Sequence, residues 1–461
     1  MGLTPTDEQK VAIDMFARFV TSRDDHAVML MKGSAGTGKT TLASAMVRAM
    51  AETKQKIVLL APTGRAAKVF AVNSRQPAYT IHRKIYRQRS GAIGMEGFSL
   101  NDNLHTDTLF VIDEASMIAN QGWNDSGFGS GHLLDDLVRY VYGGRNCRMM
   151  LIGDTAQLPP VGEDESPALM AETLQGYGLT VYETELRQVL RQSETSGILM
   201  NATTVRAMIT HGDMTALPKV RFEGYEDIRP MPGNELIESL ASSYSRAGLD
   251  DTIVITRSNR LAIRYNNGIR AMVIGNEDEL CSGDRLMIVK NNYYWTEKEK
   301  LSLPFLANGD RVRVMRVRNI RELYGFRFAD VTMAFPDYDN MEMTATVNLS
   351  TLQSEAPSLT REESNLLYNK VMEDYQHIPL KADRIKALRQ DIYFNALQVK
   401  YAYAVTCHKA QGGQWEHVYV DQGYMTDDML TPDYIHWLYT AFTRATDRLY
   451  LVNWPERNIK N

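Results

Sequence analysis

Apolar residues along this chain gather in short runs that alternate with amphipathic stretches. Four runs, at residues 27–31 (AVMLM), 57–60 (IVLL), 109–112 (LFVI) and 149–152 (MMLI), have the length and composition of buried strands. Strands of this kind with helices between them are typical of a parallel sheet that is covered on both faces. The N-terminal part of the chain is therefore predicted to form an α/β core.

Two helix starts are also marked in the sequence. Thr6 with Gln9, and Thr360 with Glu363, each form a capping box, in which two side chains satisfy backbone N–H groups at the start of a helix. After the first box, apolar residues recur at three- and four-residue spacing over residues 12–20, as in an amphipathic helix. We therefore expect helices to begin directly after Thr6 and Thr360.

The strand pattern starts again at residues 252–256 (TIVIT) and continues at 418–421 (VYVD) and 449–452 (LYLV), which predicts a second α/β core. Between the first two of these runs the chain favours short alternating strands and then charged helices, which we interpret as an insertion. The predicted organisation is a first core at residues 1–83 and 106–186, a hairpin insertion at 84–105, a second core at 187–275 and 397–461, and a larger insertion at 276–396.

Composition narrows the class of protein. The 461 residues carry 51 Lys and Arg against 56 Asp and Glu, so the net charge is −5 and no overall basic field marks nucleic acid as a partner. Apolar residues make up 44% and charged residues 23%, which excludes a disordered chain, a coiled coil and a collagen-like repeat. No stretch of the sequence is long and apolar enough to span a bilayer.

Cysteine usage and the N-terminal segment bear on the compartment. Cys147, Cys281 and Cys407 lie far apart and form no CxxC pair, which excludes a disulfide scaffold and a cysteine-rich zinc site. The N-terminal residues lack the apolar core of a secretory signal. We therefore expect a cytoplasmic protein with no membrane partner.

The strongest local motif is residues 33–40 (GSAGTGKT), which follows an apolar run and precedes a helical stretch. In a P-loop of this kind, backbone N–H groups wrap the phosphates, Lys39 contacts the β- and γ-phosphates, and the Thr40 hydroxyl holds Mg²⁺. The residues expected at the nucleotide are Gly33, Ser34, Ala35, Gly36, Thr37, Gly38, Lys39, Thr40 and Thr41. The motif thus predicts a nucleoside triphosphate and Mg²⁺ as cofactors.

Two adjacent carboxylates supply the second half of this site. Asp113 and Glu114 directly follow the apolar run at residues 109–112, so they stand at the end of a predicted strand. In this position Asp113 would complete the Mg²⁺ shell, and Glu114 would orient or deprotonate the attacking water. The pair favours hydrolysis, since a kinase would also need a pocket for an acceptor.

Residues 153–161 (GDTAQLPPV) resemble the GDxxQLPPV motif of superfamily 1 helicases, and residues 113–116 (DEAS) resemble another motif of that family. Further motifs follow in the family's order at residues 61–67 (APTGRAA), 80–82 (TIH), 190–192 (LRQ), 405–412 (VTCHKAQG) and 439–445 (YTAFTRA). The matches span nearly the whole chain, and they are most similar to the RecD-like and phage Dda-like branch.

The resemblance assigns roles to individual residues. It implies that Gln9 reads adenine and that Gln157 senses the γ-phosphate. Its implied catalytic set is Lys39, Asp113, Glu114, Gln157 and the two arginine fingers, Arg191 and Arg444. The expected nucleic-acid contacts are Lys84, from the basic stretch that follows His82, and, from the resemblance, Pro62, Thr63, Gly64, Arg65, His82, Phe98, Asn259, Thr406, His408, Lys409 and Gln411. Because both arginines belong to the second core, hydrolysis would require the cores to close on ATP.

The two insertions also have counterparts in this branch. Residues 90–105 contain several glycines and fit a small hairpin, where related helicases carry a strand-splitting pin, so we expect Phe98 to meet the duplex junction. Residues 311–318 (RVRVMRVR) alternate as in a strand with one apolar face. The resemblance implies that this strand belongs to an SH3-like β subdomain that can reach the pin and enclose the DNA strand.

The expected fold class is α/β, with two RecA-like P-loop cores, a pin insertion in the first and an SH3-like β insertion in the second. The expected function is an ATP- and Mg²⁺-dependent DNA helicase that moves 5′→3′, a polarity taken from the resemblance alone. Its expected partners are single-stranded DNA, fork and duplex junctions, and single-strand-binding or replication proteins, and we expect a monomer. The alternatives are a DNA-stimulated translocase that displaces proteins or remodels forks, and a passive single-strand-binding protein.

Overall fold

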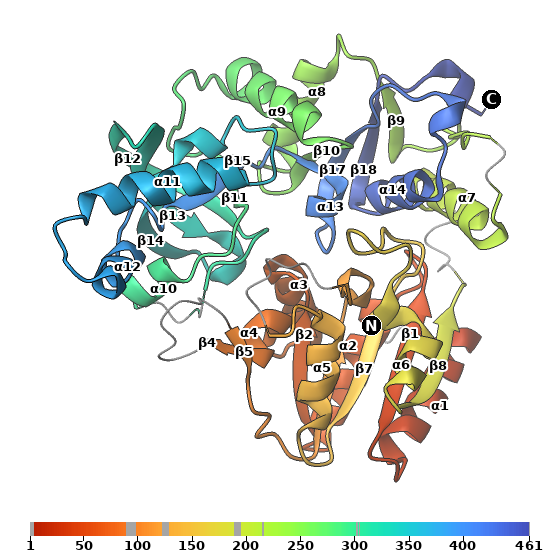
Figure 1. Cartoon of the computed structure of the whole chain (residues 1–461). Coiled ribbons are helices and arrows are strands. Elements are labelled where there is room, and N and C mark those ends of the chain that lie inside the picture. Colours follow the sequence, from red (N-terminus) through yellow and green to blue (C-terminus); the bar gives the residue numbers. More distant parts are fainter. Residues whose placement is uncertain are drawn as a thin grey trace.

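A computed structural model describes residues 4–88, 98–121, 129–188, 195–213, 216–300, 303 and 305–460 of the chain. Two parallel sheets form separate halves of the molecule, and a small barrel lies beside the second sheet (Figure 1). The predicted α/β class with two cores and a β insertion is confirmed. The two halves meet along loops at the carboxyl ends of the strands of the first sheet.

The first core is a six-stranded parallel sheet in the order β3-β2-β6-β7-β1-β8. Its strands are β1 (Ala27–Gly33), β2 (Lys56–Ala61), β3 (Ala78–Thr80), β6 (Thr108–Ile112), β7 (Arg148–Gly153) and β8 (Thr180–Leu186). Its helices are α1 (Asp7–Thr21), α2 (Lys39–Glu52), α3 (Gly64–Ser74), α4 (Ile81–Ile85), α5 (Leu133–Tyr142) and α6 (Ala171–Gly176). Along β1, Val28 and Leu30 pack into one apolar cluster and Met29 and Met31 into another, because successive side chains of a strand point to opposite faces.

The second core is a five-stranded sheet in the order β16-β10-β17-β18-β9. Its strands are β9 (Ile228–Met231), β10 (Thr252–Thr256), β16 (Ala404–Thr406), β17 (Trp415–Asp421) and β18 (Ala445–Val452). Its helices are α7 (Gly197–His211), α8 (Leu236–Arg246), α9 (Asn259–Gly268), α13 (Cys407–Ala410) and α14 (Pro432–Phe442), and a π-helix covers Ile269–Ile274.

The larger insertion forms a closed barrel. Its strands are β11 (Arg285–Ile288), β12 (Arg311–Leu323), β13 (Phe326–Phe335), β14 (Met341–Asn348) and β15 (Leu397–Tyr401), and its helices are α10 (Tyr294–Lys298), α11 (Arg361–Asp374) and α12 (Lys381–Arg389). The alternation predicted for residues 311–318 holds only in part: Val312 and Val314 of β12 are buried and Arg316 and Arg318 are exposed, but Arg311 is buried as well. A register shift between Val314 and Arg316 interrupts the alternation. The barrel shares one apolar cluster with Val254 of the second sheet, so the two parts pack as one body.

One boundary differs from the prediction. The sequence analysis places all residues from 397 onward in the second core, but β15 closes the barrel by pairing with β11 and β14. The apolar run that continues from residue 397 to 406 hides this change of sheet, because buried strands of a barrel and of a parallel sheet have similar composition. The second sheet resumes only at β16.

Local signals at the ends of elements are confirmed. Both capping boxes are formed, by Thr6 with Gln9 at α1 and by Thr360 with Glu363 at α11. The small insertion in the first core is a two-stranded hairpin, β4 (Tyr86–Gln88) paired with β5 (Phe98–Leu100). Among the described helices, none has the length and apolar character that crossing a bilayer requires.

Candidate functional site

The P-loop connects β1 to α2, where the sequence predicts it. Gly36 and Gly38 adopt left-handed φ angles of 78° and 79°, which residues with a side chain rarely adopt. α2 begins at Lys39, so the free N–H groups of its first turn point into the loop. Lys39 Nζ donates a hydrogen bond to the Ser34 carbonyl at 2.8 Å, which folds the side chain back over the loop. The loop therefore has the geometry of a phosphate cradle.

Thr40 and Asp113 come together beside the P-loop. The Thr40 hydroxyl donates to Asp113 Oδ2 at 3.1 Å, and the Glu114 N–H donates to Asp113 Oδ1 at 2.9 Å. Burial first, and then the Glu114 carboxylate, raise the pKa of Asp113 above its usual range. A hydroxyl and a carboxylate are oxygen ligands of the kind that Mg²⁺ takes when phosphates and waters complete its shell. The pair therefore fits the predicted metal position.

Gln157 joins the two cores at this site. With its amide oriented to satisfy both neighbours, it donates to Glu114 Oε2 at 3.3 Å and accepts from Arg444 Nη2 at 3.0 Å. Arg444 is only 2% exposed, and its guanidinium also donates to the carbonyls of Thr440 and Gly413. The buried guanidinium of Arg444 is thus fixed by three groups. One of them, the Gln157 amide, connects it to the predicted catalytic carboxylate of Glu114.

A cavity of about 440 Å³ occupies this junction. Its first-core wall includes Lys39, Thr40 and Asp113, and its second-core wall includes Thr443 and Arg444. The predicted catalytic residues Lys39, Asp113, Glu114, Gln157 and Arg444 therefore line one space. Arg191, the other expected finger, lies outside the described residues.

Other predicted nucleotide residues lie at the edge of this space. Ser34, Ala35 and Thr41 line the cavity. Gln9 lies beside the loop, where its Nε2 donates to the Thr37 carbonyl at 3.0 Å and its Oε1 accepts from the Thr6 N–H at 3.1 Å. Both ends of the Gln9 amide are thus used within the protein, and adenine recognition by this residue stays a prediction.

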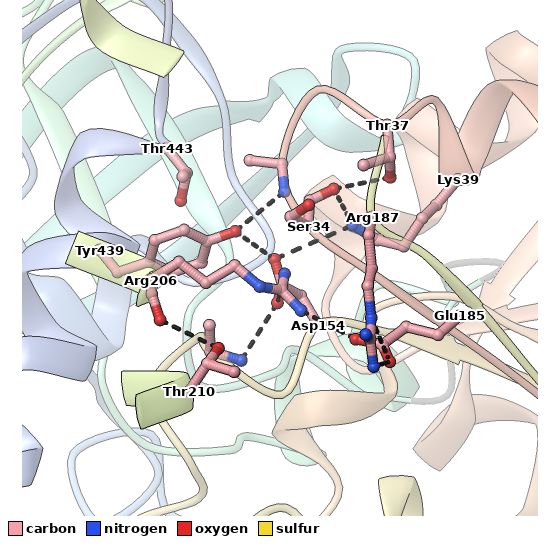
Figure 2. A network of polar contacts seen from close by, with 12 residues as sticks. Ser34, Thr37, Lys39, Asp154, Glu185, Arg187, Arg206, Thr210, Tyr439 and Thr443 are labelled. Carbon is pink, nitrogen blue, oxygen red and sulfur yellow. Dashed lines mark hydrogen bonds and ion pairs between the residues drawn. The ribbon is translucent and has the colours of Figure 1, made fainter. Parts of the chain in front are cut away.

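A buried polar network lies behind the P-loop around Asp154, Arg206 and Tyr439, for which the sequence predicts no role (Figure 2). Asp154 is fully buried and accepts from Tyr439 at 2.5 Å and from Arg206 at 3.0 Å. Tyr439 lies inside the 439–445 motif, so a pattern pointed to it. Arg206 stands in α7 with no motif around it, and only the fold reveals its partner.

The predicted nucleic-acid residues of α3 face the second core and the barrel. A side chain added at Gly412 would come within 2.9 Å of Thr63 Oγ1, and one added at Gly64 within 2.6 Å of the Tyr338 hydroxyl. The segment that includes Pro62 and Thr63 therefore meets the 405–412 motif at close range. This convergence brings together two motifs that lie far apart in the sequence.

The Arg65 side chain contacts other residues of the protein. Its guanidinium lies 4.5 Å from the centre of the Trp415 ring and 3.7 Å from Asp251, and it donates to the Gln414 carbonyl. All three partners belong to the second core. In this conformation Arg65 links the cores, and a contact with DNA stays a prediction.

The remaining predicted contacts vary in exposure. His408 is exposed, while His82, Lys84, Asn259, Thr406 and Lys409 are half-buried and Gln411 is buried. Burial first, and then Lys400, lower the pKa of Lys409 to about 8. Gln411 donates to the Leu158 carbonyl at 2.6 Å, so it ties the 405–412 motif to the 153–161 motif. Gln411 therefore connects the two motifs within the protein, and contact of these residues with DNA stays a prediction.

The expectation for Phe98 needs correction. The sequence analysis placed Phe98 at the duplex junction, but the side chain is 5% exposed and packs against Tyr293 and Phe305 at ring distances of 4.4 and 5.9 Å. An aromatic ring on a short hairpin is stabilised more by this burial than by solvent exposure. Phe98 therefore anchors the hairpin to the insertion that carries the barrel. Residues 89–97, which join its two strands, lie outside the described residues.

Comparison with known families gives two matches, one over the first core and α7 and one over the C-terminal part of the second core. Residues 5–219 match the family described as an AAA domain, and residues 401–452 match the UvrD-like helicase C-terminal domain. The first match contains the P-loop with Asp113 and Gln157, and the second contains Gln411 and Arg444. Each half of the cleft therefore belongs to a recognised family.

Three relatives extend the comparison. An uncharacterized protein of Acanthamoeba polyphaga mimivirus is 21% identical, over 96% of this chain and 98% of its own length. The ATP-dependent RecD2 DNA helicase of Deinococcus radiodurans is 24% identical, over 72% of this chain and 42% of its own length. The ATP-dependent DNA helicase dda of Enterobacteria phage T4 is 24% identical, over 67% of each chain. The chain thus spans less than half the length of RecD2.

Solved structures with a similar arrangement are Pif1 helicases. One, determined for DNA unwinding at forked double-stranded DNA by two coordinating Pif1 helicases, has a TM-score of 0.49 and 16% identity over 100% of this chain and 95% of that one. Another, Bacteroides Pif1 with ADP-AlF3 and single-stranded DNA, has a TM-score of 0.49 and 15% identity over the same shares.

The family matches on both sides of the cleft, together with the motifs that meet there, define a nucleotide-dependent helicase of superfamily 1. Within that superfamily the chain is similar to the ATP-dependent DNA helicases RecD2 and Dda, at 24% identity to each.

Proposed function

We propose that this protein moves 5′→3′ along single-stranded DNA and separates duplex, driven by hydrolysis of Mg-ATP in the cleft between its cores. The observation that carries the proposal is the bridge from Glu114 through Gln157 to Arg444. This bridge joins the acid of one core to the arginine of the other. A site completed only by both cores makes hydrolysis depend on their relative position, which is what a motor requires.

Each residue at the cleft then has a chemical task. Lys39 binds the β- and γ-phosphates, and Glu114 orients the attacking water and accepts its proton. Thr40 and Asp113 would hold Mg²⁺, which neutralises phosphate charge when it is bound. Arg444 stabilises the charge that develops on the transferring phosphoryl group. Arg191 would add a second positive charge, on the basis of its motif alone.

Unwinding needs this coupling because strand separation is costly. Each base-pair step costs about 1.4 kcal/mol, so opening ten pairs is disfavoured by roughly ten orders of magnitude without an energy source. The proposed DNA path runs along the surface where α3, the 405–412 motif and the barrel meet, on the basis of the motifs that the first two segments carry. Fork and duplex junctions are the substrates proposed for this path.

The test compares ATP hydrolysis with and without a single-stranded oligonucleotide. Gln157→Ala should reduce the DNA-stimulated rate much more than the basal rate, because it removes the link between the cores. Gln353→Ala is the matched control, since Gln353 is an exposed glutamine that pairs with Asn267. A wild-type protein that DNA does not stimulate would contradict the proposal and favour a passive single-strand-binding protein.

A second candidate is a DNA-stimulated translocase that displaces proteins or remodels forks without processive unwinding. The burial of Phe98 favours it, because the aromatic side chain expected at the junction is committed to packing inside the protein. Tailed duplexes distinguish the two candidates. A translocase would hydrolyse ATP on these substrates and leave the strands paired.

A further inference from the structure

Asp154 is the centre of a buried cluster that both cores build. It directly follows β7, and its carboxylate is fully buried. Three groups donate hydrogen bonds to it: the Tyr439 hydroxyl at 2.5 Å, Arg206 Nη1 at 3.0 Å and the Ala156 N–H at 3.1 Å. Lys39 Nζ adds a positive charge at 4.0 Å. A buried carboxylate is stable only with such partners, and the second core supplies two of them, Tyr439 and Arg206.

Tyr439 touches the P-loop as well as Asp154. Its hydroxyl accepts a hydrogen bond from the Ala35 N–H at 2.9 Å while it donates to Asp154 Oδ2. Both groups belong to the first core, and Tyr439 belongs to α14 of the second (Figure 2). The Ala35 N–H is one of the backbone donors that line a phosphate cradle. The Tyr439 hydroxyl of the second core therefore contacts the P-loop directly, so this contact depends on where the second core lies.

Two other residues of α14 also form hydrogen bonds with the 153–161 motif. His436 Nδ1 lies 2.9 Å from the Ala156 carbonyl, and Thr440 Oγ1 accepts from the Leu158 N–H at 2.7 Å. Arg444 continues the same helix face two turns after His436, just beyond the helix end. Tyr439 is thus one of three residues of α14 that hold the helix against this segment, close to Arg444.

Arg206 attaches a second helix to the same point. Its guanidinium donates to Asp154 Oδ1 at 3.0 Å and to Glu185 Oε1 at 3.3 Å, so α7 is tied to the ends of β7 and β8. Burial raises the pKa of Tyr439 well above its usual value, with Asp154 as the next cause, so the phenol stays a donor at neutral pH. Moving the second core away would remove Tyr439 and Arg206 and leave Asp154 with only its first-core partners, the Ala156 N–H and Lys39.

We propose that Tyr439 is a positioning residue that couples the P-loop to the approach of the second core, through Ala35 and Asp154. This inference rests on the proposed function, since it says how closure is communicated within the same ATP site. Tyr439 helps to hold α14 against the first core, and α14 in turn presents Arg444. Lys39, 4.0 Å from Asp154, is the group through which a bound phosphate would alter the same cluster.

The test is Tyr439→Phe, which keeps the buried ring and removes one oxygen. Tyr434→Phe is the matched control, because Tyr434 is a buried tyrosine of the same helix whose hydroxyl donates to Gln422 of the second core at 2.6 Å. The first readout is hydrogen–deuterium exchange of the nucleotide-free protein. Tyr439→Phe should speed exchange in the peptide that contains Ala35, and Tyr434→Phe should not. Equal exchange in the wild type and Tyr439→Phe would overturn the inference.

The second readout is steady-state ATP hydrolysis with saturating single-stranded DNA. Tyr439→Phe should lower kcat about 10-fold and change KM for ATP little, because the lost hydrogen bond serves positioning and not ground-state binding. A kcat equal to that of Tyr434→Phe would overturn the inference. If the wild type itself shows no DNA-stimulated hydrolysis, the proposed function fails, and the exchange experiment still decides whether Tyr439 holds the P-loop.

Discussion

The Thr40 hydroxyl lies 3.1 Å from Asp113 Oδ2, so the first turn of α2 and the end of β6 present two oxygen ligands to one point. The donor set is incomplete for a protein-only metal site, and no group of three or more His, Cys, Asp or Glu side chains suited to a metal occurs among the described residues. Mg²⁺ that binds together with a nucleotide needs no further protein ligands, because phosphates and waters fill its other coordination positions.

Removing magnesium should therefore abolish hydrolysis. With excess EDTA the ATPase rate should fall to background, and added Mg²⁺ should restore it. Thr40→Val should raise the Mg²⁺ concentration for half-maximal rate about 10-fold, because the variant keeps the shape but loses one ligand. Thr40→Ser, which keeps the hydroxyl, is the control. An unchanged Mg²⁺ requirement in Thr40→Val would contradict the assignment.

Lys39→Ala should abolish hydrolysis while single-stranded DNA binding persists. The side chain lies over the P-loop and bonds to Ser34, whereas the proposed DNA path lies at α3 and the barrel. ATPase assays and fluorescence anisotropy with a labelled oligonucleotide measure the two properties separately. Loss of DNA binding in a variant with an intact far-UV spectrum would show that the sites are not modular.

Phe98→Ala should impair strand separation more than DNA-stimulated hydrolysis. Truncation removes a ring that packs on Tyr293 and Phe305, a loss that costs about 3–5 kcal/mol at buried aromatic sites, so the hairpin should detach from the larger insertion. Phe98→Leu fills most of the space and should retain more unwinding. Unwinding rates on a tailed duplex, divided by ATPase rates, give the comparison. If both activities fall equally, the hairpin has no separate part in unwinding.

Asp310 should make stability depend on pH. The carboxyl is 4% exposed, it accepts from the Ala307 N–H and the Tyr338 hydroxyl, and burial raises its pKa to about 7. The folded protein then holds this proton more tightly than the unfolded chain, so the stability contributed by Asp310 falls as pH rises from about 4 to about 7. Asp310→Asn cannot ionise and should lack this dependence.

Urea unfolding of both proteins at pH 5, 6, 7 and 8 measures the effect. As pH rises toward 7, the free energy of unfolding of the wild type should fall relative to that of Asp310→Asn by up to about 1.4 kcal/mol per pH unit. Above pH 7 the difference between the two proteins should stay constant. A constant difference below pH 7 as well would contradict the raised pKa.

The parts of the site that the sequence predicts are those coded by residues close together in the chain. The P-loop requires left-handed backbone at Gly36 and Gly38, and only a short motif is needed to recognise it. Asp113 is found in the same way, because it ends a buried strand. These features depend on local backbone geometry, so one segment of sequence is enough.

What the sequence does not predict depends on contacts between distant segments. Arg206 has no motif, and its partner Asp154 lies 52 residues away across the cleft. Phe98 shows the same limit, because a lone aromatic residue in a hairpin fits an exposed wedge and a buried anchor equally well until Tyr293 and Phe305 are placed beside it. The pattern of β15 likewise fits either sheet, and only its pairing partners decide.

We propose that hydrolysis between the two cores drives 5′→3′ movement that separates duplex. The most direct test is ATP-driven unwinding of two duplexes, one with a 5′ single-stranded tail and one with a 3′ tail, with Lys39→Ala as the inactive control. We predict that the wild type opens the 5′-tailed duplex and leaves the 3′-tailed one paired. Opening of only the 3′-tailed duplex would contradict the polarity, and failure to open either while DNA stimulates hydrolysis would contradict strand separation itself.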